Sequence, residues 1–103
     1  MEIKTEELIS VLNEIESLLV DEAHWLNLIS SANKRIKNSD YSGIELLLSY
    51  YGGMGSFNDL IIDQPTIQGS LEFSQDSKAK NNKLSKLKTK AFELSNYIKH
   101  NHE

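Results

Sequence analysis

The sequence predicts a small all-α protein, a bundle-like domain of four or five helices with a long irregular loop before the C-terminal helix. Three observations support this fold class. Apolar residues recur every three or four positions in separate segments, which is the spacing of amphipathic helices. The chain has 103 residues, so we expect residues 1–103 to form a single helical domain. Hydrophobic residues make up 39% and charged residues 25% of it, as in chains that fold around one core.

The first segment predicts a helix over about residues 5–20. Thr5 is a suitable N-cap, and Glu6 and Glu7 lie where the helix dipole favours negative charge. The apolar stripe of this helix consists of Leu8, Ile9, Leu12, Ile15, Leu18 and Leu19.

A second helix is expected to begin near Asp21 and to end after Lys37. Lys34 and Arg35 suit its C-terminal end because cations are favoured there. The polar residues 38–40 then predict a turn. The apolar positions of this helix include Trp25, Leu26, Ile29, Ala32 and Ile36.

The tetrapeptide at residues 42–45 has the form of a capping box. In such a box the Ser42 hydroxyl and the Glu45 carboxylate would each accept from a backbone N–H at the helix start. We therefore expect a short third helix from Ser42 to about Tyr51, where two glycines end it. A brief further turn is expected over residues 56–60.

Residues 63–82 predict a long loop because they contain the only proline and a polar run. The last segment predicts a C-terminal helix, whose apolar stripe is Leu84, Leu87, Ala91, Leu94 and Ile98. Its lysines at 83, 86, 88 and 90 are expected largely on the opposite face.

Charge is unevenly distributed along the chain. Residues 1–76 hold thirteen acidic and four basic residues, whereas residues 77–103 hold seven basic and two acidic residues. The acidic part repels phosphate backbones and attracts basic surfaces, although solubility alone remains an alternative explanation. The lysine run at 78–90 contains no arginine and no aromatic residue, so we expect a solvated helix face and no direct nucleic-acid or membrane partner.

Catalytic, metal-binding and cofactor sites are not expected, and we predict that the chain is not an enzyme. There is no cysteine, and the glycine-rich loop at 52–56 lacks the lysine of a phosphate-binding loop. Asp59 and Asp63 offer too few oxygen ligands for calcium, and the histidines are scattered. Apolar runs never exceed three residues, so we expect a cytoplasmic protein.

The run SGIELLL at 42–48, followed by YGGMGSFNDL at 51–60, resembles the signature of a family of short bacterial proteins without an assigned function. The resemblance covers about residues 23–62 and includes Trp25 in the preceding helix. It implies a structural motif in which the glycine turn supports a helical core. The motif residues are Trp25, Ser42, Glu45, Tyr51, Gly52, Gly53, Met54, Gly55, Ser56, Phe57 and Asn58.

Members of this kind occur in toxin and immunity gene neighbourhoods, so the chain resembles an immunity protein of contact-dependent growth inhibition. The resemblance implies a toxin inhibitor that binds a cognate C-terminal toxin domain, usually a basic nuclease, as a monomer in a 1:1 complex. For the partner-binding residues we predict Asp59, Asp63, Glu72, Phe73 and Asp76, acidic positions with one apolar anchor. Two alternatives remain open: a helical adaptor without a toxin, and a small enzyme or anion-binding domain built around residues 52–59.

Overall fold

The computed structural model describes residues 3–51, 57, 60 and 75–101, with the side chains of 75–77 left out. Within these residues the chain forms four helices and no strand. They are α1 (Ile3–Leu18), α2 (Ala23–Lys37), α3 (Ser42–Ser49) and α4 (Gln75–Asn101). The predicted all-α class is confirmed.

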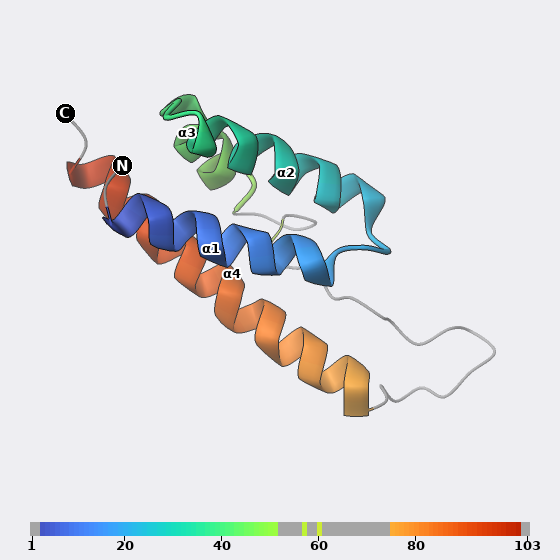
Figure 1. Ribbon diagram of the computed structural model, residues 1–103. Helices are drawn as coiled ribbons and strands as arrows, with labels where there is room; N and C mark the ends of the chain where they lie inside the picture. Colours follow the sequence, from blue (N-terminus) through green and yellow to red (C-terminus); the bar gives the residue numbers. More distant parts are fainter. Residues whose placement is uncertain (1–2, 52–56, 58–59, 61–74, 102–103) are drawn as a thin grey trace.

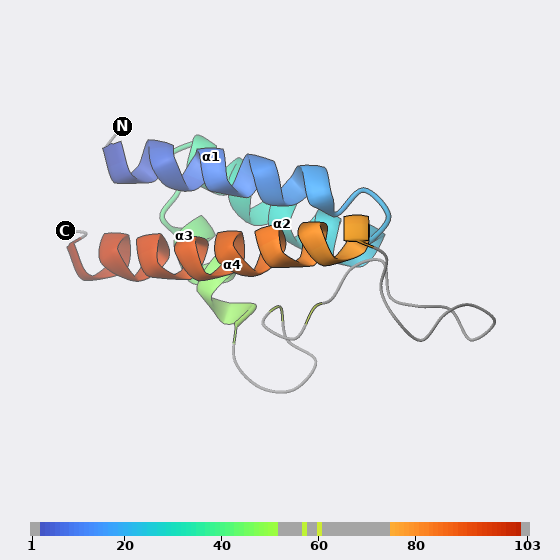
Figure 2. The ribbon, with the colours of Figure 1, turned by 90° about the horizontal axis from the view of Figure 1, so that it is seen from below.

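The four helices pack as a small bundle around one core (Figure 1). α1 and α4 run antiparallel and side by side in both ribbon views, so the two ends of the described chain lie at the same end of the molecule (Figures 1 and 2). α2 turns back along α1, and α3 contacts both α2 and α4. The long axis of the bundle is 51 Å and the shorter axes are 22 and 19 Å.

The predicted apolar stripes form the core. Burial of these side chains removes apolar surface from water and is the main stabilising contribution to the bundle. The buried residues include Leu8, Leu12 and Ile15 of α1; Ile29, Ala32 and Ile36 of α2; Ile44 and Leu47 of α3; and Leu84, Ala91, Leu94 and Ile98 of α4.

The turn between α2 and α3 follows the prediction and closes α2 with a Schellman arrangement. The Ser39 N–H donates to the Ile36 carbonyl at 3.0 Å, and the Asp40 N–H donates to the Arg35 carbonyl at 2.9 Å. Ser39 has φ 61°, the left-handed conformation that such a helix end requires. The four-residue connection, residues 38–41, therefore sets α3 tightly against α2.

Two predicted helix starts are wrong. Thr5 lies inside α1, which begins at Ile3. The capping box at 42–45 does not form either, because Ser42 is the first helical residue and the cap position is Tyr41, without a side-chain bond. The Asp40 carboxylate instead accepts from the Ser42 N–H at 2.9 Å. The Ser42 hydrogen bonds lower the pKa of Asp40, and the charge of Arg35 adds a smaller effect.

The predicted long loop at 63–82 is wrong over residues 75–82, which form the first turns of α4. This stretch has no apolar stripe, so the spacing rule could not detect it. Its lysines and Ala79 are good helix formers, however, and extending an existing helix costs much less than nucleating one. The 27-residue α4 therefore begins well before its first buried side chain, Leu84, in the described part.

Candidate functional site

Most of the predicted partner-binding residues lie outside the described part of the chain. Asp59, Asp63, Glu72 and Phe73 are not among the described residues, and Asp76 lies in the first turn of α4 without a described side chain. Six motif residues also lie outside it: Gly52, Gly53, Met54, Gly55, Ser56 and Asn58. Their predicted roles stay predictions.

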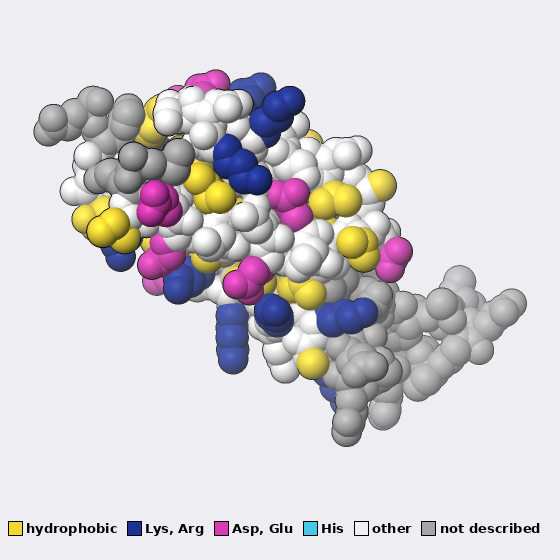
Figure 3. All heavy atoms as spheres, viewed as in Figure 1, with side chains coloured by type: hydrophobic (Ala, Val, Ile, Leu, Met, Phe, Trp, Pro, Cys, Tyr) yellow, Lys and Arg dark blue, Asp and Glu magenta, His cyan; other side chains and the backbone are white. Residues whose placement is uncertain are grey.

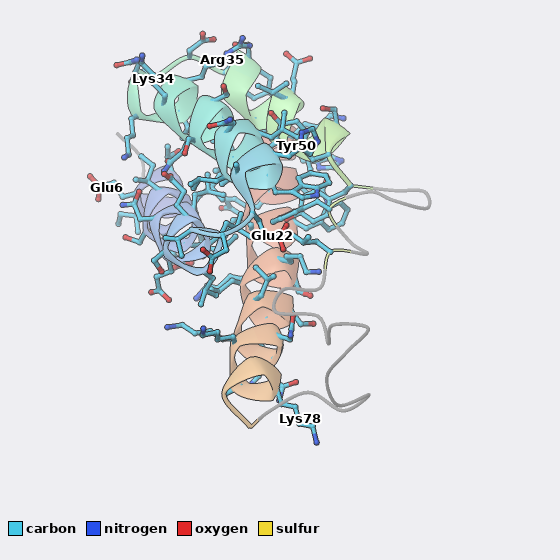
Figure 4. The ribbon with its side chains drawn as sticks, turned by 90° about the vertical axis from the view of Figure 1, so that its right-hand side faces the viewer. Glu6, Glu22, Lys34, Arg35, Tyr50 and Lys78 are labelled. Atoms are coloured by element: carbon cyan, nitrogen blue, oxygen red, sulfur yellow. The ribbon has the colours of Figure 1, made fainter. Side chains whose placement is uncertain are left out.

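An aromatic cluster gathers three of the described motif residues, Trp25, Tyr51 and Phe57. Phe57 is fully buried, with its ring centroid 5.2 Å from that of Trp25 and 5.6 Å from that of Tyr51. Tyr50 points into the bundle beside α2, and its hydroxyl donates to the Leu28 carbonyl at 2.9 Å (Figure 4). Ser42 and Glu45 are not in the cluster; Ser42 is half-buried and Glu45 is exposed on α3. The cluster joins the segment after α3 to the start of α2.

Lys88 of α4 fastens the same segment from the other side. Its side chain is only 8% exposed, and its ammonium donates to the carbonyls of Phe57 at 3.2 Å and Leu60 at 3.0 Å. The Tyr51 hydroxyl donates back to the Lys88 carbonyl at 2.8 Å. Burial raises the pKa of Tyr51, so this hydroxyl keeps its proton and stays a donor over the physiological range. The expectation that Lys88 lies on the outer face is therefore wrong.

The outer face of α1 is the acidic surface that the described residues provide. Residues 3–22 hold six carboxylates and one lysine. Glu6 projects away from the bundle (Figure 4), and Glu14 is exposed on the same helix. Acidic side chains gather over α1 in Figure 3, whereas cationic ones lie along α4 and over α2. The surface thus separates charge by helix.

Ion pairs between α1 and α4 do little to neutralise this face. Lys83 approaches Glu14 at 3.9 Å and Lys90 approaches Glu7 at 4.0 Å, both near the limit for a salt bridge. All four side chains are more than a third exposed, and exposed pairs of this kind contribute about 0–1 kcal/mol. The carboxylates of α1 therefore remain available to a partner.

The turn between α1 and α2 adds an apolar side chain to the acidic surface. Val20 is 69% exposed and is followed directly by the exposed Asp21 and the half-buried Glu22. An apolar contact within a charged rim is the usual composition of a protein-binding surface. The turn differs from the expected helix over residues 5–20, at whose end Val20 was placed.

A polar seam lies between α1 and α2 beside the acidic face. The Glu16 carboxylate accepts from the Ser30 hydroxyl at 2.9 Å and from the Asn33 amide at 2.5 Å. The same amide nitrogen donates to the Asn13 side-chain oxygen at 2.9 Å. Asn33 is only 1% exposed. Its position between the apolar residues Ala32 and Ile36 is a signal in the sequence that it faces the helix interface.

In the described ranges no group of three or more acidic or histidine side chains is arranged to hold a metal ion. No helix among them is long and apolar enough to cross a membrane.

Fold and surface together define a small all-α domain with an acidic helix face. The chain is similar over residues 18–68, a little under half of its length, to a family described as Domain of unknown function (DUF6966). The matched stretch contains α2, α3 and the motif segment, and the description assigns no activity to them. Neither the curated proteins nor the solved structures contain a match.

Proposed function

We propose that this chain is a bacterial immunity protein of the contact-dependent growth inhibition type. It would act in the cytoplasm as a nuclease inhibitor, binding a cognate toxin domain and blocking its active site or substrate groove. The observation that carries the proposal is the acidic character of α1 and the following turn, since residues 3–22 hold six carboxylates and one lysine. The resemblance of the motif at 42–60 supplies the class of partner.

The physical argument is electrostatic complementarity. A nuclease binds a polyanion and therefore presents a basic groove, which an acidic helix face can occupy in place of the substrate. Such complementarity accelerates association, because opposite charges steer the two surfaces together. The carboxylates of α1 stand on a helix that is packed along α2 and α4, so binding does not have to order a flexible segment.

A helical adaptor without a toxin partner is the second candidate. It is favoured by two aromatic side chains that α4 leaves exposed, Phe92 at 40% and Tyr97 at 48%. Aromatic rings are frequent anchors in protein interfaces, and this pair lies on the lysine-bearing helix rather than on the acidic face. An adaptor of this kind would bind through α4 and would not require a basic partner.

Co-purification tests the proposal. The protein is expressed together with the C-terminal domain of the protein encoded immediately upstream, and the nuclease activity of that domain is then titrated. We expect a 1:1 complex and inhibition that is complete at equimolar protein. If no complex forms and the activity is unaffected, the immunity function is wrong and the adaptor is the better account.

A further inference from the structure

Glu16 is a fixed carboxylate that no cation of the described residues contacts. Its two oxygens accept hydrogen bonds from Ser30 and Asn33 of the neighbouring helix, and the side chain is half-buried. Among the described residues no lysine or arginine lies within salt-bridge distance of it. The donors are neutral, so they hold the carboxylate in place while leaving its negative charge uncompensated.

The seam also contains more acceptors than donors. The buried Asn33 Nδ2 is shared between Glu16 and Asn13, whereas its Oδ1 has no partner in the described part of the chain. Exchanging the two ends of the amide would not help, because an oxygen would then face the acceptors of Asn13 and Glu16. Within the described residues the seam therefore combines an unpaired buried acceptor with a carboxylate that no cation contacts, so additional donors would suit it.

We propose that the seam formed by Asn13, Glu16, Ser30 and Asn33 receives a cationic side chain, most simply an arginine, from the protein partner. This inference rests on the proposed function and names the point of contact on its acidic surface. A guanidinium carries five donors and a fixed positive charge, and it matches a carboxylate with neighbouring amide oxygens better than a neutral group does. Glu16 would make the charge-assisted contact, and Asn33 would act as the positioning residue beneath it.

The surroundings fit this occupant. Asn13 is exposed and forms the open edge of the seam, so a side chain can approach from solvent. The exposed Ser17 follows Glu16 on α1 and has a small side chain. Val20 lies just beyond α1 and offers an apolar contact to the aliphatic part of a long cationic side chain.

The decisive variants are Glu16→Gln and Asn13→Lys. Glu16→Gln removes the charge but keeps an acceptor. Asn13→Lys changes an exposed residue and places an internal cation beside Glu16, so the fold should be retained even if Glu16→Gln is destabilised. Thr89→Lys is the matched control, because it adds the same charge at an exposed position of α4.

Binding to the upstream-encoded toxin domain, made catalytically inactive, is measured by titration calorimetry at ionic strengths of about 0.05 and 0.15 M. We expect each seam variant to weaken the affinity about tenfold or more, with the smaller salt dependence that follows from losing a charged contact. Thr89→Lys should change the affinity by less than about twofold. Circular dichroism spectra establish that each variant is folded.

The outcomes separate the seam from the proposed function. Binding by the unmodified protein with unchanged affinity in Asn13→Lys overturns the inference and leaves the immunity function standing. Equal losses in Asn13→Lys and Thr89→Lys also overturn it, because general charge would then explain both. If the unmodified protein does not bind the domain, the proposed function and the inference fail together.

Discussion

Lys88 shows how a charged side chain can hold a small core together. Its ammonium reaches two backbone carbonyls, at Phe57 and Leu60, and lies 5.7 Å from the centroid of the Phe57 ring. Carbonyl oxygens and an aromatic face both stabilise an ammonium group, so these contacts offset part of the cost of burying its charge. Lys88 thereby connects α4 to the segment that follows α3.

We predict that Lys88→Met lowers the free energy of unfolding by about 2 kcal/mol, because two carbonyls lose a buried donor while most of the packing is kept. Urea unfolding followed by fluorescence is the measurement. Trp25 is the only tryptophan and its ring is in contact with Phe57, so the signal reports on this cluster. The control is Lys86→Met at an exposed position of α4, expected to stay within about 0.5 kcal/mol. Equal effects of the two variants would contradict the role of Lys88.

The sequence contains part of the information about Lys88. Position 88 falls between Leu84 and Ala91 on the apolar stripe of the C-terminal helix, so its inward direction follows from helical spacing. A lysine there still suggests solvent, since long side chains usually carry their charge to the surface. The carbonyls that receive the ammonium belong to a segment about thirty residues away, and no local pattern can identify them.

The contact between α2 and α3 depends on Gly43. A Cβ atom at this position would lie 2.8 Å from the Ala32 carbonyl oxygen and 2.9 Å from the Arg35 Cβ. Both are parts of α2 that cannot rotate away, so the two helices can approach this closely only with glycine at position 43. Gly43, inside α3, is therefore a packing residue, and the expected capping role of its neighbour Ser42 is not needed.

We predict that Gly43→Ala destabilises the protein by about 1–3 kcal/mol, although alanine is the better helix former by about 1 kcal/mol. Overpacking against a backbone oxygen should exceed the gain in helix propensity. Thermal unfolding by circular dichroism measures the change. Ser31→Ala, on the exposed side of α2, is the control and should be neutral or slightly stabilising. A stabilised Gly43→Ala variant would show that α3 can move away from α2 at little cost.

Spacing of apolar residues identified α1, α2 and α4, because each of these helices buries a stripe against the others. The short α3 was expected from the capping-box pattern instead. Apolar spacing does not locate the first residue of a helix, because polar capping side chains determine it. Asp40 and not Ser42 bonds to the first turn of α3, and both residue types are common caps. Apolar spacing also failed at residues 75–82, because an exposed helical extension has no apolar stripe to detect.

Charge is partitioned over the whole molecule, with acids on α1 and lysines on α4. The overall imbalance was evident from the sequence, but its assignment to faces was not. The predicted contact residues were chosen from the acidic segment 59–76, whereas the described acidic surface belongs to α1 and the turn after it. The polar seam could not be predicted, because it joins residues of two helices through contacts that only their antiparallel packing creates.

The rate of association can distinguish contact through the acidic segment 59–76 from contact through the α1 face. We predict that the combined variant Asp63→Lys, Glu72→Lys and Asp76→Lys slows association with a basic nuclease domain about tenfold, because long-range attraction acts mainly on encounter. Its association rate should also depend less on salt, which stopped-flow mixing at several ionic strengths would measure. The control, Glu45→Lys with Glu93→Lys, shifts the net charge in the same direction at exposed positions of α3 and α4. Equal slowing of association in both variants would mean that net charge alone steers the partner. Contact through the segment 59–76 would then be wrong, and the α1 face would be the better candidate.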